Sequence, residues 1–489
     1  MIKLTVFFAI ICLLGINAGF SQAKPEWDKV FAKINEEVQA NSKAYGTLKQ
    51  ATETIGHRLT GSANGKKAEE YAYNLLKSYG YTNLHYQPFE VESWSRGTLA
   101  VTIGQDPNNL QTIKSVSLAH SPVKADVTFE VVDMGNGVEE DYLTNPGKAK
   151  DKIALVYLGV LPGSKSGTKS LHRSEKTAIA TKHGAKGIIV INTATGGILL
   201  TGTASVTGKL IPIPAVCIGK EDGMHLKEQL VSGKLYSHIA MTNFSGLIKA
   251  RNIVATIKGK TLPKEKVVVG GHLDSWDLAT GAIDNGIGSF AVLDMARTFK
   301  ILKLQPERTI EFVLFMGEEE GLLGSKAYVA DAVKDKSINQ LRYMLNYDMT
   351  NDPKGYATTA EESKELFQAI GNIARSLDTS FKNQFRSGAG LHSDHQPFML
   401  HGVPTGGGAG GGLPNNAGPC YHADCDNFSL VDEKGMKNTV RFSAMLLYGI
   451  ADAKEIKAKH FTDDETRSFL LKNNLKEPLQ IAGEWRWKD

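Results

Sequence analysis

The sequence has few of the features that mark disulfide-rich, repeat, nucleic-acid-binding or membrane-spanning proteins. Its 489 residues include only 4 cysteines, and no short-period repeat is visible. Lys and Arg number 56 against 52 Asp and Glu, a formal net charge of +4. Such a balance favours neither nucleic acid nor an anionic membrane as a partner. Beyond the N-terminus no stretch is long and apolar enough to cross a bilayer, so we expect no membrane span.

The one long apolar run lies at the start of the chain. Lys3 precedes an apolar segment from Leu4 to Ile16, and Ser21-Gln22-Ala23 has the small-x-small pattern of a cleavage site. This order predicts a secretory signal peptide over residues 1–23, because the run is short for a membrane span. We therefore expect export, to the periplasm or the extracellular space.

Three cysteines follow the predicted signal peptide. An oxidising compartment would allow Cys420 and Cys425 to form a disulfide around Tyr421 and His422. Cys217 lies within an apolar run, 213–218, and is expected to be a small buried side chain.

The rest of the chain is too long for one ordinary domain, and its pattern changes twice. Residues 24–122 start with helical periodicity and continue into a strand. Short β-rich runs between Gly- and Pro-containing turns fill 123–241, which predicts an inserted β-rich domain without metal ligands. Strands and helices alternate from 242 to 458, and a charged tail, 459–489, is expected on the surface. We expect helices at 287–301, 361–377 and 434–453.

Three apolar runs in the second part each end at ionisable residues. The run 267–271 leads to His272, the run 310–316 to Glu318 and Glu319, and the run 341–347 to Asp348. Open α/β sheets keep their sites at the carboxyl ends of the strands. The pattern predicts an α/β fold, a mixed central sheet flanked by helices, with a site at these strand ends.

The residue types at this site are those that bind zinc, which takes imidazole nitrogen and carboxylate oxygen. Each acid alone would more often be solvated or cap a helix, and His422 alone would more often be an ordinary loop residue. As a set they suit two metal ions sharing one carboxylate, for which Asp284 is the natural bridge. The candidate ligands are His272, Asp284, Glu319, Asp348 and His422.

Neighbouring residues can support such a site. His272 and Asp274 are two residues apart at a strand end, so Asp274 can hold the far ring nitrogen of His272. Glu318 and Glu319 are adjacent and cannot easily both face one metal ion. One of them would bind metal, and the other could take a proton from a metal-bound water.

Substrate contacts are predicted beside the ligands. Trp276 and Asp277 follow the His272–Asp274 pair and are expected near the cleft mouth, where Asp277 would attract a substrate amino group. Tyr421 and His395 are further candidates, although Ser393-Asp394 before His395 also fits a helix N-cap. The glycine-rich stretch 405–412 could line the same pocket or form a flexible surface loop.

The ordered motifs resemble the M28 family of zinc peptidases, and the inserted region 123–241 resembles a protease-associated (PA) domain. Gly56-x-Arg-x-x-Gly-Ser62 and Ser393-Asp-His-x-Pro-Phe398 fit the same family, so the resemblance covers most of the chain. Its other motifs are His272-x-Asp274, Gly281-x-x-Asp-Asn285, Glu318-Glu-x-Gly-Leu-x-Gly-Ser325, Asp348-Met-Thr350 and Tyr421-His422.

The resemblance implies a di-zinc exopeptidase acting on short peptides, and the predicted signal peptide adds that it is exported. It makes Glu318 the general base and Asp274 the residue that orients His272, and it implies a cis peptide after Asp284. It also assigns the two zinc ions to His272, Glu319, Asp348 and His422, bridged by Asp284.

Several alternatives remain open. A dipeptidase and an aminopeptidase acting on longer peptides share all these ligands. A dipeptidase needs a cationic or N–H-rich feature to hold the free carboxylate, and Lys169, Arg173 or Lys176 of the insertion are candidates. Glutaminyl cyclases use the fold with one zinc, M20-type deacylases lack the Gly-Leu-x-Gly-Ser continuation, and a non-catalytic PA-containing binding protein should have lost ligands or the base. The chain could be a monomer or a homodimer.

Overall fold

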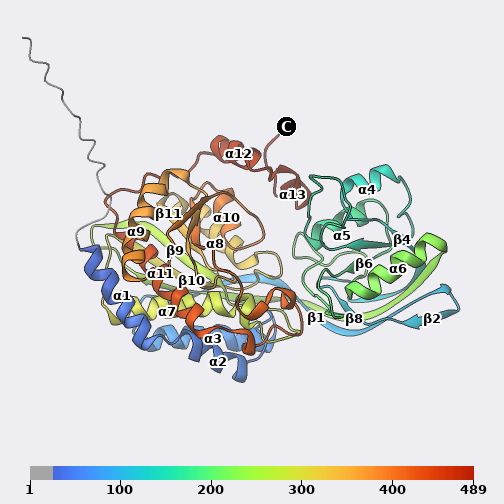
Figure 1. The fold of residues 1–489 in the computed structure, drawn as a ribbon, viewed down its shortest axis with the longest axis horizontal. Coiled ribbons are helices and arrows are strands. Elements are labelled where there is room, and N and C mark those ends of the chain that lie inside the picture. Colours follow the sequence, from blue (N-terminus) through green and yellow to red (C-terminus); the bar gives the residue numbers. More distant parts are fainter. Residues whose placement is uncertain (1–25, 489) are drawn as a thin grey trace, which may run out of the picture.

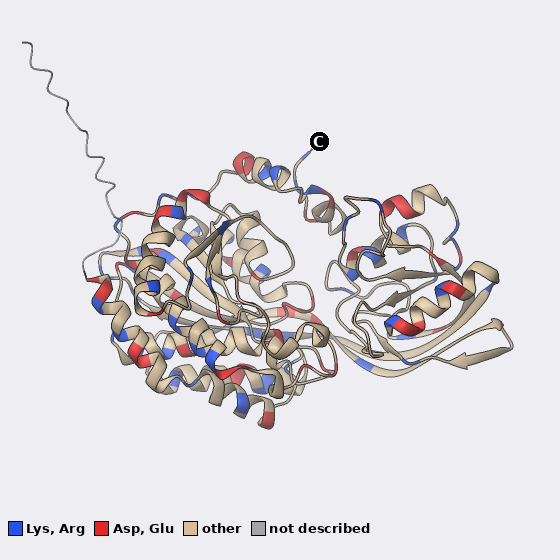
Figure 2. Ribbon diagram, viewed as in Figure 1, with Lys and Arg blue, Asp and Glu red and all other residues tan. Residues whose placement is uncertain are grey.

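A mixed fourteen-stranded sheet runs through two lobes of the molecule (Figure 1). The computed structural model describes residues 26–488, so the predicted signal peptide lies outside the described residues. The strands follow the order β13-β12-β14-β11-β9-β10-β8-β4-β5-β6-β7-β3, and β1 pairs with β8 and β2. Basic and acidic residues are interspersed over both lobes (Figure 2). Within residues 26–488, no helix has the length and apolar character that a bilayer crossing requires.

The larger lobe contains the three predicted strands side by side. The strand β9 (Leu262–His272) runs parallel to both β10 (Arg308–Phe315) and β11 (Leu341–Asn346). Their side chains alternate between two cores: Val267 and Val269 point to one face, and Val268 to the other. This burial on both faces explains the continuous apolar runs. The sheet continues through β14 (Thr405–Ala409), β12 (Gly355–Thr358) and β13 (Gln384–Ser387).

Helices cover both faces of this sheet, which confirms the predicted fold class. The three predicted helices are present, and the one at 361–377 starts with a 3₁₀ turn before the α-helix proper. The larger core contains residues of α1 (Trp27–Asn41), α2 (Ala44–Thr54), α3 (Ala63–Ser78), α7 (Ile287–Ile301), α9 (Lys364–Leu377) and α11 (Glu433–Asp452). The opposite core contains residues of α8 (Leu323–Lys334) and α10 (His395–Leu400).

The smaller lobe has two cores of its own, one on each face of its strands. Its helices are α4 (Glu139–Thr144), α5 (Arg173–Lys182) and α6 (Lys220–Ser232). Its strands are β2 (Asn109–Thr112), β3 (Ser115–Ser117), β4 (Lys124–Asp133), β5 (Ile153–Tyr157), β6 (Gly187–Ile191) and β7 (Ala215–Ile218).

The predicted boundaries of the insertion, 123 and 241, do not coincide with breaks in the structure. Two long antiparallel strands, β1 (Leu84–Asp106) and β8 (Leu235–Ile257), pass from one lobe into the other. The first half of β8 pairs with β4, and its second half pairs with β10. Both β2 and β3 precede residue 123, yet they pair with β1 and β7. The lobes therefore share one sheet while keeping separate cores.

The C-terminal tail is more ordered than its charge predicts. It forms α12 (Asp463–Lys472) and α13 (Lys476–Ile481), and α13 lies between the lobes (Figure 1). Leu470 and Leu479 are fully buried with Met399 and Leu400 of α10. The prediction of a surface tail is therefore wrong for these two leucines, which anchor the segment to the larger lobe.

Candidate metal centre

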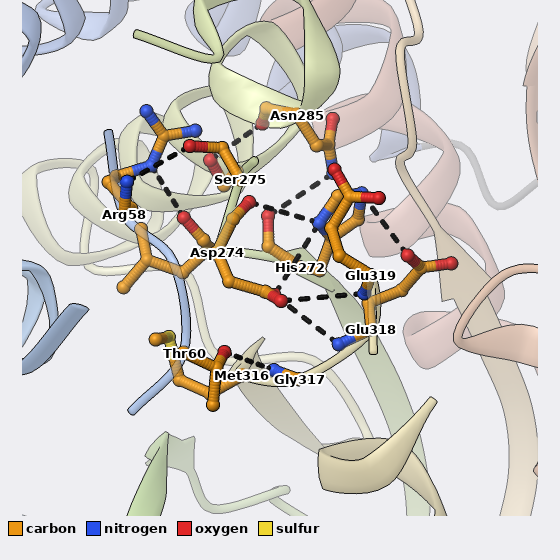
Figure 3. A network of polar contacts seen from close by, with 12 residues as sticks. Arg58, Thr60, His272, Asp274, Ser275, Asn285, Met316, Gly317, Glu318 and Glu319 are labelled. Carbon is orange, nitrogen blue, oxygen red and sulfur yellow. Dashed lines mark hydrogen bonds and ion pairs between the residues drawn. The ribbon is translucent and has the colours of Figure 1, made fainter. Parts of the chain in front are cut away.

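Strand ends and two loops bring the five predicted ligands together. His272 is the last residue of β9, Glu319 follows β10 and Asp348 follows β11. Asp284 lies in the turn Ala282–Gly286 before α7, and His422 lies in the loop closed by Cys420 and Cys425. Figure 3 shows His272, Glu318 and Glu319 pointing toward one another. Chain segments far apart in sequence thus meet at one edge of the sheet.

The ligand atoms form two groups that meet at Asp284. Asp284 Oδ1 lies 3.3 Å from His272 Nε2, and Asp284 Oδ2 lies 3.0 Å from His422 Nε2. Asp348 Oδ1 lies 3.4 Å from His272 Nε2, and Glu319 Oε2 lies 2.9 Å from His422 Nε2. Each oxygen of Asp284 therefore faces a different histidine–carboxylate pair.

The candidate ligand side chains leave buried oxygen atoms unpaired, and divalent cations would pair them. Glu319 Oε1 and Asp348 Oδ1 are buried and have no hydrogen-bond partner among the described residues. A buried carboxylate oxygen without a partner is costly, and a cation removes that cost. Ligand atoms of His272, Asp284 and Glu319 lie within 4.8 Å of one another, as do those of His272, Glu318 and Asp348. Nitrogen and carboxylate oxygen donors at this spacing are suited to zinc.

The pKa shifts of the candidate residues also indicate a site for cations. Burial raises the pKa of Glu318, and Asp348 and Glu319 raise it further against the opposing effect of His272. Burial lowers the pKa of His272, but Glu318 and Asp348 outweigh it and hold that pKa well above its usual value. Burial also raises the pKa of Glu319, and bound cations would favour loss of the protons from both glutamates.

Glu318 differs from the ligand candidates in its position. Its Oε2 lies 4.0 Å from His272 Nε2, farther away than the nearest oxygens of Asp284 and Asp348. It also lines the cleft described below. This is where a base that touches a reacting water would lie.

Asp274 contacts both halves of the site. Its Oδ1 lies 3.6 Å from His272 Nδ1. Its two carboxylate oxygens accept the backbone N–H groups of Glu318 and Glu319, each at 3.4 Å (Figure 3). The carbonyl oxygen of Asp274 lies closer, 3.2 Å from His272 Nδ1, so Asp274 contacts His272 and also positions the segment that carries both glutamates.

Two further residues, for which the sequence predicts no such role, hold the Asp284 turn. Asp426 accepts the backbone N–H groups of Ile283 at 2.7 Å and Asp284 at 3.0 Å. The buried Arg58 donates to the carbonyl oxygens of Leu273, Thr280 and Gly281. Arg58 lies inside the Gly56–Ser62 motif, so the sequence marked Arg58 as a motif residue without revealing which carbonyl oxygens it binds. The Asp284–Asn285 peptide is cis, as the family resemblance implies.

The cysteines match the sequence expectations. Cys420 and Cys425 form a disulfide with a Cα–Cα distance of 5.2 Å. Cys217 is buried and unpaired within the described part of the chain. The disulfide fixes the short loop that carries Tyr421 and His422.

A cleft between the lobes opens onto the candidate ligands. Tyr421 lines it, and its ring stacks on His422 with centroids 3.8 Å apart. The smaller lobe contributes His172, Arg173 and Glu175 of α5 and its N-cap to the same cleft. Residues 391–392 of the larger lobe and several residues of the C-terminal tail complete the lining.

Trp276 and Asp277 do not line the main cleft, although Trp276 lines a small hollow beside Asp284, Glu319 and His422. Trp276 is only 4% exposed and packs with Leu59 and Trp94 behind His422, at a centroid distance of 6.0 Å from it. Asp277 accepts two hydrogen bonds from Arg96, each at 2.7 Å. Its charge is therefore compensated by a residue of β1 and is not available to a substrate amino group.

His395 and the glycine-rich stretch lie in a neighbouring hollow. His395 lines a hollow with Asp348 and Gly406–Gly408, outside the main cleft. Residues 405–409 form β14, which pairs with β11 and β12, so a flexible surface loop is the wrong description for them. His395 is thus not brought to the main cleft.

Of the three basic candidates for a carboxylate contact, one reaches the site. Lys176 is buried and donates to the carbonyl oxygens of Tyr157 and Leu158. Lys169 forms an ion pair with Glu477. Arg173 Nη2 lies 2.8 Å from Nδ1 of His422, next to the candidate ligands.

Comparison with known proteins identifies the family. Residues 252–447 match peptidase family M28, and residues 127–226 match the PA domain. The chain therefore carries a peptidase family M28 domain, at residues 252–447. It is thus a metallopeptidase, and the inserted lobe is confirmed as a PA domain.

Relatives of this M28 peptidase span its length. Mouse carboxypeptidase Q is 25% identical over 477 residues, covering 92% of this chain and 98% of the relative. The segment Gly271–Asp277 is itself similar to carboxypeptidase Q. Aminopeptidase YwaD of Bacillus subtilis is 29% identical over 371 residues, 74% of each chain.

Solved structures share the fold. A peptidase M28 precursor from Shewanella amazonensis superposes with a TM-score of 0.74 at 24% identity, covering 89% of this chain and 98% of that one. An aminopeptidase from Aneurinibacillus sp. strain AM-1 gives 0.66 at 26% identity, with 88% and 98% covered. Both matches extend across the two lobes of the M28 peptidase described above.

Proposed function

We propose that this M28 peptidase is a di-zinc exopeptidase that hydrolyses dipeptides. One observation carries the proposal: Asp284 presents one oxygen to the His272–Asp348 pair and the other to the His422–Glu319 pair. Two ions sharing Asp284 would each receive one histidine and one further carboxylate. The names of the relatives, carboxypeptidase Q and aminopeptidases, support peptide hydrolysis.

The chemistry divides between the ions and Glu318. When bound, the ions would polarise the scissile carbonyl and lower the pKa of a water molecule. Glu318 accepts the proton of that water and returns it to the leaving amine. Asp274 holds His272 and the segment of Glu318 in the positions that this proton transfer requires. The presence of all five ligands and of Glu318 favours catalysis over a binding role.

Arg173 is the group we propose to bind the free carboxylate of a dipeptide. A guanidinium has no acceptor, so Arg173 must donate to Nδ1 of His422. A histidine that binds metal through Nε2 carries its proton on Nδ1, and that proton would face Arg173. Metal binding therefore separates Arg173 from His422 and frees its donors. Arg173 also begins α5, whose N-terminal N–H groups favour an anion.

The test compares a free dipeptide with its C-terminal amide on the zinc-loaded enzyme. The dipeptide should be hydrolysed with the higher kcat/KM. Arg173→Met should raise KM for the dipeptide about 10- to 100-fold, the loss expected for a charge-assisted contact, and leave the amide unchanged. Lys182→Met is the matched control, since Lys182 lies at the other end of α5 and pairs with Glu139 outside the cleft.

The competing function is an aminopeptidase acting on longer peptides. Its supporting observation is the similarity to aminopeptidases of Bacillus and Aneurinibacillus. Equal kcat/KM values for the dipeptide and its amide would refute the dipeptidase proposal and leave the aminopeptidase.

We also propose that the chain is exported to the periplasm or the extracellular space. The predicted signal peptide and the Cys420–Cys425 disulfide, which is typical of oxidising compartments, support this. Cell fractionation with N-terminal sequencing tests it: the mature chain should begin at Lys24. Recovery of unprocessed protein from the cytosol would contradict export.

A further inference from the structure

The C-terminal segment 476–488 crosses from the larger lobe to the PA domain. Figure 1 shows α12 beside the larger lobe and α13 close to α5. We propose that this segment closes one end of the substrate cleft and so limits the length of peptide that the enzyme accepts. This inference rests on the proposed peptidase function and adds a specificity-determining element to it.

The segment is held firmly to the larger lobe. Leu479 is fully buried in a cluster with Met399 and Leu400 of α10. Glu484 forms an ion pair with Lys326 of α8 at 2.6 Å and accepts a hydrogen bond from Gln396 of α10 at 2.7 Å. The segment is therefore held by a buried leucine and by a charge-assisted pair, and both contacts fix it to the larger lobe.

A second set of contacts joins the same segment to the PA domain. Ile481 packs against the apolar core of that domain. Glu477 forms an ion pair with Lys169 in the loop before α5. The two sets of contacts alternate along the segment, with Glu477 and Ile481 on the PA domain and Leu479 and Glu484 on the larger lobe, so the segment bridges the two lobes.

The bridging residues line the cleft that contains the metal centre. Pro478, Leu479, Ala482 and Glu484 share this lining with Glu318, Asp348, His422 and Arg173. A peptide bound at the metal centre and extending toward this wall would meet apolar side chains and the paired carboxylate of Glu484. A dipeptide whose carboxylate is held by Arg173 ends before the wall, whereas a longer peptide must displace it.

The main experiment weakens only the contacts to the PA domain. The double variant Glu477→Lys/Ile481→Asp places like charges at Lys169 and puts a carboxylate against an apolar core. Leu479 and Glu484 keep their anchors on the larger lobe. The substrates are Ala-Ala and Ala-Ala-Ala-Ala, hydrolysed by the zinc-loaded full-length enzyme.

The ratio of kcat/KM for the tetrapeptide to that for the dipeptide should rise at least about tenfold in the double variant, a change that one lost steric barrier can supply. The value for the dipeptide should stay within about threefold of wild type, since no residue of the metal centre is altered. Gln480→Ala, at an exposed position of the same helix, should leave the ratio unchanged.

A second variant removes residues 474–489 and should raise the same ratio. If it does not fold, as judged by near-UV circular dichroism, the double variant decides alone. A folded double variant with an unchanged ratio overturns the inference, even though the enzyme remains a peptidase. Failure of zinc-loaded wild type to hydrolyse either peptide would instead overturn the proposed function.

Discussion

At the scale of single residues, each candidate ligand depends on a neighbour that fixes it. Ser393 donates to Asp348 Oδ2 at 2.7 Å and itself accepts from Asn346. Asp426 fixes the backbone of Asp284, and Asp274 lies beside His272. Such outer partners set ligand orientation and commonly change metal affinity 10- to 100-fold when removed. The positions of the candidate ligands are therefore determined by their neighbours as well as by the ligands themselves.

The role of Glu318 gives the first prediction. Glu318→Gln keeps the shape of the side chain but removes the base, so kcat should fall about 10²- to 10⁴-fold. Metal content should stay at the wild-type value, because the five candidate ligands are intact. Steady-state kinetics and elemental analysis of the same sample check both parts. Near wild-type turnover would show that Glu318 is not the base, and the roles assigned to Glu318 and Glu319 would have to be revised.

The ligands were predictable because each motif ties a residue to a strand end or turn. His272, Glu319 and Asp348 follow apolar runs that became adjacent parallel strands. The partners of Asp277 and Trp276 were not predictable, because Arg96 lies on β1, far away in the sequence. A local pattern states what a residue can do, whereas a long-range contact decides whether it is free to do it.

At the scale of elements, continuous apolar runs predicted β9, β10 and β11 well, and the joining strands poorly. The strand expected after the helical start of residues 24–122 is β1, which extends to Asp106 through a register shift between Arg96 and Leu99. At the junction of the lobes the ribbon is only partly covered: Trp94 of β1 is buried against Leu59 and Trp276, whereas Phe244 and Leu247 of β8 are exposed. The alternation that marks a half-buried strand is absent there, so its length is hidden from pattern analysis.

The helix α7 gives a prediction for stability. Phe299 is fully buried between the sheet and α11, in contact with Phe312 and Tyr448. Phe299→Ala should lower the free energy of unfolding by about 3–5 kcal/mol, the cost of a large cavity. Ile301→Ala, two residues later and 56% exposed, is the matched control and should change it by less than about 0.5 kcal/mol. Urea unfolding measures both, and equal effects would contradict the packing described.

The contact between α11 and the end of α9 gives a pH prediction. Burial raises the pKa of Asp378, but Arg441 and the Ser380 amide outweigh it and lower that pKa to about 2. The folded protein then binds this proton less readily than the unfolded chain does. The stabilisation is present above about pH 4 and is lost as the pH falls through 2. The Tm difference between wild type and Asp378→Asn should therefore shrink from pH 5 to pH 2, and a constant difference would argue against the pair.

At the scale of the whole molecule, two lobes with separate cores meet around the site through three connections. The β1–β8 ribbon passes below the cleft, the C-terminal segment crosses between the lobes, and Arg173 of the PA domain reaches His422 of the larger lobe. Neither lobe alone contains both the ligands and the basic group. The order of the lobes in the chain was predictable from composition, but the bridging role of the tail was not, since its charged residues suggested only a solvated surface.

The metal centre should therefore also determine the stability of the assembled enzyme. Binding to the folded state alone adds about 4 kcal/mol to the free energy of unfolding when the free ion is at 1,000 times its Kd. In its absence Glu319 Oε1 and Asp348 Oδ1 are buried without a hydrogen-bond partner among the described residues. Removing metal with a chelator should lower Tm, and added zinc should restore it. Asp284→Asn, which replaces the shared carboxylate by a neutral amide, should have the lower Tm from the start and respond little to chelator or zinc. Differential scanning calorimetry of both proteins makes the comparison, and a wild-type Tm that is indifferent to chelation would show that the site does not hold metal.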